Sequence, residues 1–182
     1  MNPLADQYEK QFKACVILPG KKAVVQKAAA RILANRARYE ALAQTFTRLP
    51  WWVVGILHSL ECNGRFDQHL HNGDPLTART VNVPAGHPKK GKAPFTWEAS
   101  ARDAIITDGL DLVTDWSPGS ALIALELYNG PGYRRRGVPS PYLWSFTDQY
   151  KAGKYTADGK YDPKAISQQA GCAALMKLLL PS

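Results

Sequence analysis

The 182-residue sequence lacks long apolar runs, and no stretch reaches the roughly 18 apolar residues that a membrane-spanning helix needs. Its first segment, MNPLADQYEK, is polar and has no apolar centre of the kind found in secretory signals. We therefore expect neither a transmembrane segment nor a signal peptide.

Cysteine is scarce and unpatterned. The three cysteines are an odd number and include no C-x-x-C pair, which argues against a disulfide scaffold and against a cysteine-based zinc site. We expect Cys15, Cys62 and Cys172 to be free thiols in a protein made in a reducing compartment.

Histidine is also scarce, and the four residues are His58, His69, His71 and His87. The spacing of His69 and His71 suits one face of a strand, but no matching acidic or cysteine pattern indicates zinc. We expect no metal and no cofactor, and we expect the HLH pair to lie at the surface or to contact substrate.

Acidic residues are outnumbered, 15 against 23 Lys and Arg, so the formal net charge is +8. Such a charge favours polyanionic partners, among them a bacterial wall with its carboxylates. The basic residues are scattered along the chain and no nucleic-acid-binding motif accompanies them, so we expect no nucleic-acid partner.

What is present is an ordinary globular composition, with 45% hydrophobic and 21% charged residues. The length fits one domain over residues 1–182, with a helical segment over 1–48 packed on it. A stretch without Gly or Pro, from Lys21 to Phe46, predicts one long helix or two helices broken near Asn35. Thr96 is a plausible N-cap for a further helix.

The stretch from Pro50 to Pro75 carries the strongest functional signal. Its apolar pattern predicts a helix that starts at about Trp51 and ends at Asn63-Gly64, because Gly is common after the last helical turn. Glu61 then lies in the last turn, where the helix dipole and apolar neighbours both raise a carboxyl pKa. A raised pKa is what a general acid near neutral pH requires.

Two later segments could form a cleft with that helix end. The turn from Asn72 to Pro75 is followed by alternating residues, which predicts a strand and hence a small β-hairpin beside the cleft. Further on, a helix starting at Ser117-Pro118 breaks into a Gly-rich turn within ALELYNGPGY, residues 124–133. Glu126 in that apolar helix is expected on the helix's one wet face, and the alternative is that it faces the same cleft as Glu61.

The segment YKAGKYTADGKY, residues 150–161, predicts a second small hairpin around Asp158-Gly159. The whole pattern is that of a mainly α-helical α+β protein.

Glu61, the polar turn and the Tyr128-Asn129-Gly130 motif, in this order, resemble the lysozyme-like superfamily, in particular goose-type lysozymes, soluble lytic transglycosylases and phage or prophage endolysins of the muramidase type. In those families a helix ends with a catalytic Glu, and a later A-Y-N-x-G motif lines the sugar cleft. This chain departs from them at Cys62, where many relatives have Ser, and at Leu127, where the motif has Ala. The Gly-Leu-Met-Gln type segment is not found.

The resemblance implies a lysozyme-like fold and hydrolysis of the β-1,4 bond between N-acetylmuramic acid and N-acetylglucosamine in peptidoglycan, with Glu61 as general acid. Asp74 would be the second catalytic group, with Asp67 as its rival or the substrate acetamido group in its place. The substrate-binding residues would be Thr77, Thr80, Tyr128, Asn129 and Tyr133.

We expect a monomeric bacteriolytic hydrolase, made in the bacterial cytoplasm and reaching the cell wall after release through a holin or lysis. Two alternatives remain open at this point. One is a lytic transglycosylase that leaves 1,6-anhydro ends, and the other is a non-catalytic module that binds cell wall or nucleic acid.

Overall fold

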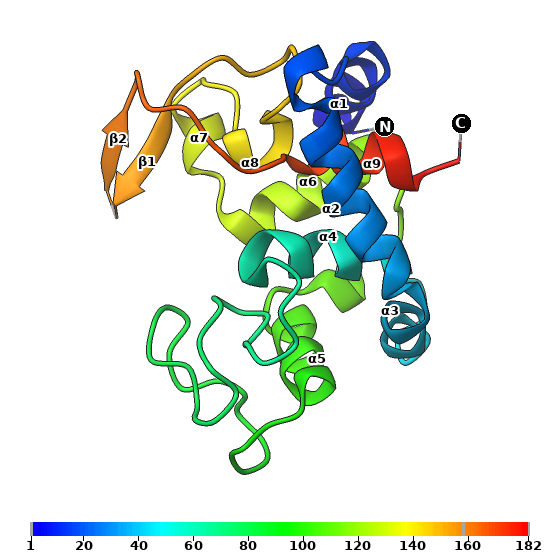
Figure 1. The fold of residues 1–182 in the computed structure, drawn as a ribbon, viewed down its shortest axis with the longest axis vertical. Coiled ribbons are helices and arrows are strands. Elements are labelled where there is room, and N and C mark those ends of the chain that lie inside the picture. Colours follow the sequence, from blue (N-terminus) through cyan, green and yellow to red (C-terminus); the bar gives the residue numbers. More distant parts are fainter. Residues whose placement is uncertain (1, 158, 182) are drawn as a thin grey trace. The chain divides into compact units, whose positions relative to one another are not determined.

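The computed structural model describes residues 2–157 and 159–181, which form two compact units (Figure 1). Unit 1 contains the residues up to Ala30 together with those from Asp115 onward, and unit 2 is Arg31–Thr114. The described residues are mainly helical and include one two-stranded antiparallel sheet, which confirms the α+β class. None of the helices in these residues has both the length and the apolar character needed to cross a bilayer.

Unit 1 is built on the packing of α1 (Pro3–Ala14) against α6 (Pro118–Asn129). Asn2 caps α1 by accepting a hydrogen bond from the Leu4 N–H, and the predicted Ser117-Pro118 start of α6 is confirmed. The two helices approach closely at Gly119, where an added Cβ would lie 2.1 Å from the Ala5 carbonyl oxygen. A side chain at Gly119 would therefore force the helices apart.

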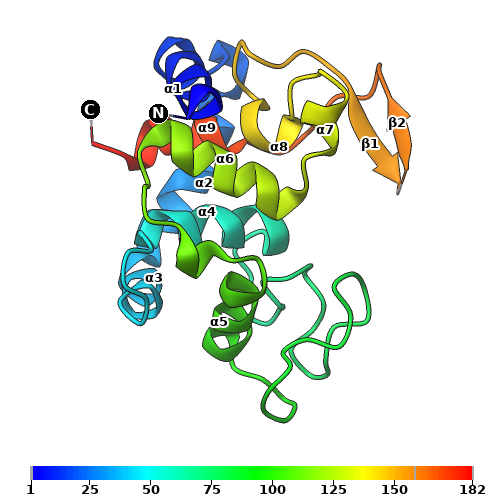
Figure 2. The ribbon, with the colours of Figure 1, turned by 180° about the vertical axis from the view of Figure 1, so that it is seen from behind.

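The rest of unit 1 consists of short elements around these helices. They are η1 (Pro19–Lys21), the first part of α2 (Lys22–Ala34), α7 (Gly132–Arg135), α8 (Pro141–Trp144) and α9 (Cys172–Leu179). Strands β1 (Lys154–Ala157) and β2 (Lys160–Asp162) pair antiparallel, which confirms the hairpin predicted over residues 150–161. The hairpin lies beside α7 in both views (Figure 2). Asp158, expected in its turn, lies outside the described residues.

Glu126 is buried, with 1% of its surface exposed, so its expected position on a wet face is wrong. Tyr8 of α1 donates a hydrogen bond to Glu126 Oε1 over 3.0 Å, and Arg134 Nε lies 3.1 Å from Oε2. Burial raises the pKa of Glu126, although the Tyr8 hydrogen bond and the Arg134 charge oppose the rise. Two partners from other elements allow an acid to occupy this apolar helix.

Unit 2 contains the end of α2, α3 (Arg36–Ala43), α4 (Trp51–Cys62), α5 (Trp97–Thr107) and η2 (Leu110–Leu112). The helix start at Trp51 and the Thr96 cap on α5 are confirmed. Of the two alternatives for residues 21–46, the structure has two helices that meet at Asn35. The side chains of Ile32 and Tyr39 pack directly against Gly55 of α4. A Cβ added at Gly55 would lie 2.5 Å from Ile32 Cγ2, so a larger residue would not fit there without a shift. Eight of the twelve residues of α4 are buried, so this helix forms the core of unit 2.

Residues 63–96, all of which the structure describes, form a long loop without a strand, so the hairpin predicted beside Glu61 is wrong. Only an isolated bridge between Gln68 and Pro75 remains of it. The apolar members of the alternating pattern do not face a core, since Val81 is 78% and Val83 is 89% exposed. The backbone of this segment bonds instead to side chains and local turns, and Figures 1 and 2 show it as an irregular loop beside α5.

No disulfide joins the three cysteines in the described part of the chain, and Cys15, Cys62 and Cys172 are all buried.

Candidate functional site

Glu61 lies half-buried in the last turn of α4, as predicted. The helix ends at Asn63, which adopts the left-handed conformation with φ of 50° and whose N–H bonds to the His58 carbonyl. Arg31 Nη1 holds this end by donating to the Asn63 carbonyl over 2.7 Å and to its Oδ1 over 2.8 Å. The helix end next to Glu61 is therefore anchored to Arg31 of α2.

The loop after α4 docks on the same helix end. Cys62 Sγ donates to the His69 carbonyl over 3.2 Å, and His58 Nε2 lies 3.0 Å from the Arg65 carbonyl. Gly73, with φ of 80°, passes so close that an added Cβ would lie 3.0 Å from the Glu61 carbonyl oxygen. The expected polar turn over residues 72–75 thus contacts the backbone of Glu61, although no hairpin forms there.

Asp74 is buried and organises the loop. Its Oδ2 accepts hydrogen bonds from the N–H groups of Val81 and Asn82 over 2.8 and 3.0 Å, and its Oδ1 accepts from Asn82 Nδ2 over 2.6 Å. Burial raises the pKa of this carboxyl, but the hydrogen bonds outweigh it and hold the pKa below its ordinary value. Asp74 is consequently a carboxylate at neutral pH with both oxygens engaged by the loop.

Asp74→Asn should loosen the loop, because the new amide N–H₂ cannot accept the hydrogen bonds that the lost oxygen accepted. We expect the Val81 and Asn82 amides to lose hydrogen-exchange protection equivalent to about 1–3 kcal/mol. The folded-state pKa lies below the unfolded value of about 3.9, so this stabilisation is present above that pH and is lost as pH falls through the folded pKa. The substitution should flatten that acid dependence.

Asp67→Asn is the matched control for this experiment. Asp67 is exposed and forms an ion pair with exposed Arg65 at 2.8 Å, a contact of small energy. Protection of Val81 and Asn82 should not change in this variant. Unchanged protection in Asp74→Asn would contradict its role in the loop.

The two threonines of the candidate site differ in exposure. Thr77 is exposed, whereas Thr80 is buried and its hydroxyl accepts from the His87 N–H over 2.9 Å while donating to the Pro84 carbonyl. Both hydrogen-bonding roles of the Thr80 hydroxyl therefore serve the turn over residues 80–87.

Tyr128, Asn129 and Tyr133 belong to unit 1. Asn129 is the exposed last residue of α6, where Gly130 turns the chain with φ of 94°. Tyr133 is buried, accepts a hydrogen bond from the Tyr155 N–H over 3.0 Å, and meets the Tyr155 ring edge-on with centroids 5.1 Å apart. An open pocket of about 630 Å³ is lined by Asn129, Gly130, Gly132, Tyr133, Tyr155, Thr156, Ala157 and Gly159. Polar groups beside aromatic rings suit a sugar.

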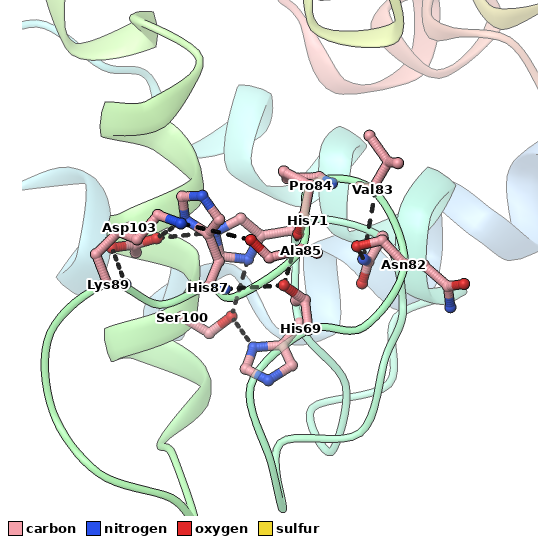
Figure 3. A network of polar contacts seen from close by, with 12 residues as sticks. His69, His71, Asn82, Val83, Pro84, Ala85, His87, Lys89, Ser100 and Asp103 are labelled. Atoms are coloured by element: carbon pink, nitrogen blue, oxygen red, sulfur yellow. Dashed lines mark hydrogen bonds and ion pairs between the residues drawn. The ribbon is translucent and has the colours of Figure 1, made fainter.

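The structure also assembles a cluster that the sequence analysis missed. His69, His71 and His87 are buried, so the expected surface position of the HLH pair is wrong. Asp103 of α5 lies between two of them. Its Oδ2 is 2.6 Å from His87 Nδ1 and 3.0 Å from His71 Nε2, both within hydrogen-bonding distance (Figure 3). One signal in the sequence could have pointed to this cluster. Ser100 and Asp103 are three positions apart, so a helix presents both polar side chains on one face.

The electrostatics of this cluster follow from its burial and hydrogen bonds. Burial lowers the pKa of His71, although the Asp103 hydrogen bond and charge oppose that effect. Burial of Asp103 disfavours its charge, but hydrogen bonds from His87, the Lys89 N–H and His71 outweigh it and hold its pKa below the ordinary value. The cluster therefore favours a neutral His71 beside an ionised Asp103.

The expected site residues thus divide between the units. Unit 2 holds Glu61, Asp74, Thr77 and Thr80, and unit 1 holds Tyr128, Asn129 and Tyr133. No protein-family model, no curated protein sequence and no solved structure matches this chain.

Proposed function

We propose that this chain is a peptidoglycan-degrading muramidase with Glu61 as its general acid. The observation that carries the proposal is the setting of Glu61, a half-buried acid in the last turn of the apolar core helix of unit 2. Arg31 anchors the helix end next to it, and Gly73 of the docked loop packs against its carbonyl oxygen. A half-buried acid on an anchored helix end beside a polar loop suits proton donation to a glycosidic oxygen.

In this reaction Glu61 protonates the oxygen that leaves between N-acetylmuramic acid and N-acetylglucosamine, as an oxocarbenium-like transition state develops. Asp74 follows Gly73, which approaches the Glu61 carbonyl, and its carboxylate would supply a fixed negative charge on this loop that favours the developing positive charge. Thr77 is an exposed hydroxyl on the same loop and is available to substrate. Asn129 and Tyr133 would hold a sugar at the aromatic pocket of unit 1, which they line. Tyr128 precedes Asn129 in the chain but does not line this pocket, and its role rests on the Tyr-Asn-Gly motif alone.

A specific observation favours a lytic transglycosylase as the second candidate. Both Asp74 oxygens already accept hydrogen bonds, so Asp74 is poorly placed to take a proton from water. A transglycosylase needs no activated water, because the muramyl C6 hydroxyl closes onto C1 and leaves a 1,6-anhydro end. Asp67, which is exposed, or the muramyl acetamido group would otherwise take the second role.

Digestion of purified sacculi tests the proposal and separates these candidates. We expect turbidity to fall and mass spectrometry to find muropeptides with reducing muramic acid ends. Products lighter by one water would instead identify the transglycosylase. Sacculus binding without any solubilised muropeptide would contradict both enzymes and favour the binding module.

A further inference from the structure

Three side chains converge in unit 2 outside the proposed catalytic residues. His71 and His87 come from the long loop and Asp103 from α5, and one ligand atom from each lies within 4.8 Å of the others. Figure 3 shows both imidazole rings directed at the Asp103 carboxylate. From this geometry we propose that His71, His87 and Asp103 bind one divalent transition metal ion of the zinc class, which fastens the loop to α5.

The donor set matches this class of ion. Two imidazole nitrogens and one carboxylate oxygen suit Zn²⁺, and Co²⁺ as its spectroscopic substitute, better than Mg²⁺ or Ca²⁺, which prefer oxygen ligands throughout. Ligand atoms about 2.0–2.1 Å from a tetrahedral zinc are roughly 3.3 Å from one another. The nitrogens of His87 and His71 lie 2.6 and 3.0 Å from Asp103 Oδ2, so small side-chain rotations would admit the ion.

The surrounding hydrogen bonds orient each ligand, as in established metal sites. Asp103 Oδ1 accepts from the Lys89 N–H over 3.1 Å, which leaves Oδ2 directed at the histidines. His71 Nδ1 lies 3.5 Å from Ser100 Oγ, which in turn lies 2.7 Å from His69 Nδ1. The backbone of His87 exchanges hydrogen bonds with Thr80 through its N–H and its carbonyl. The ligands are therefore held in place before any ion arrives.

The burial of the three side chains also suits a metal site. The His71 side chain is fully buried, that of His87 is 8% exposed and that of Asp103 is 19% exposed, so solvent reaches the cluster mainly at the carboxylate. Three protein ligands leave a fourth position for water. The site joins a loop without regular structure to a helix, which is where a metal cross-link stabilises most.

The test is metal binding by the whole chain after removal of metal with a chelator. We expect isothermal titration with Zn²⁺ to show one site, and Co²⁺ to give the visible absorption of a tetrahedral nitrogen and oxygen site without a thiolate charge-transfer band. Bound Zn²⁺ should raise Tm and slow amide exchange in residues 71–89. This proposal does not depend on muramidase activity, because binding is measured without substrate.

Asp103→Asn keeps the shape of the side chain and removes its charge, and it should weaken Zn²⁺ binding at least ~10-fold. His87→Gln provides a second ligand variant, with the same expectation, in case Asp103→Asn fails to fold. Glu40→Gln is the matched acid-to-amide control on α3, where Glu40 pairs with Arg36, and it should bind Zn²⁺ as the parent does. No binding by the parent at millimolar Zn²⁺, or equal binding by the parent and a folded ligand variant, would overturn the proposal.

Discussion

Glu61→Gln is expected to reduce the lysis of purified sacculi by a factor of about 100 or more, the usual contribution of a general acid. Glutamine has nearly the shape of glutamic acid but no proton of suitable pKa to give to the glycosidic oxygen. Arg31 holds the helix end through two hydrogen bonds to Asn63, and the substitution leaves both of these groups in place. Folding and sacculus binding should therefore persist in the variant.

The measurement is the initial rate of turbidity loss, with circular dichroism and a sacculus pull-down on the same preparation. Glu40→Gln serves as the control, because Glu40 lies on α3 in an ion pair with Arg36 and should not affect the rate. A Glu61→Gln variant that retains more than a tenth of the parent rate would sink the assignment of Glu61. Loss of the rate together with loss of folding would require the assay to be repeated on Glu61→Asp, which retains an acid but sets it back from the substrate.

Gly119→Ala is expected to destabilise the protein by about 3 kcal/mol, the upper end of the usual range for overpacking, or by more. The new Cβ would lie 2.1 Å from the Ala5 carbonyl oxygen and 3.0 Å from both the Ala5 carbonyl carbon and the Glu9 nitrogen. These are backbone atoms of α1, so no side-chain rotation relieves the overlap. The hydrogen bond from the Gly119 N–H to Glu9 Oε2, 2.8 Å long, would be disturbed as well.

Urea unfolding monitored by circular dichroism measures this loss, and Tm should fall by roughly 2–4 °C per kcal/mol for a chain of this size. Gly20→Ala is the control, since nothing lies within 4 Å of a Cβ added there, and its effect should stay within about 0.5 kcal/mol. Gly109→Ala separates steric overlap from backbone strain. Nothing lies within 4 Å of a Cβ added at Gly109, but its φ of 67° is unfavourable for alanine, so we expect a loss of about 1 kcal/mol. Equal stability of the Gly119 and Gly20 variants would refute the close packing of α1 on α6.

The sequence by itself determined the helix boundaries that depend on local chemistry. The Thr96 cap, the Ser117-Pro118 start and the Asn63-Gly64 end all involve groups within a few residues of one another. The sequence left one long helix or two open for residues 21–46, and the structure decided for a break at Asn35. The position of Glu61 in the last turn of α4 follows from the same local signals. A capping hydrogen bond or a positive φ needs no distant partner, so such features can be predicted without a tertiary structure.

Only the tertiary structure decided the residues whose partners are distant in sequence. Val81 and Val83 alternate like strand residues, but no core faces them, and the backbone there bonds to Asp74 instead. Periodicity reports which residues are apolar, whereas burial depends on what packs against them.

The buried acid and the histidine cluster follow the same rule. Glu126 is stable inside an apolar helix because Tyr8, 118 positions away, supplies a hydroxyl. Asp103 meets His87 and His71 across 16 and 32 positions, a separation at which residue spacing carries no information about contact. The loop and α5 must fold before these three side chains become neighbours, and it is this convergence that creates a candidate metal site.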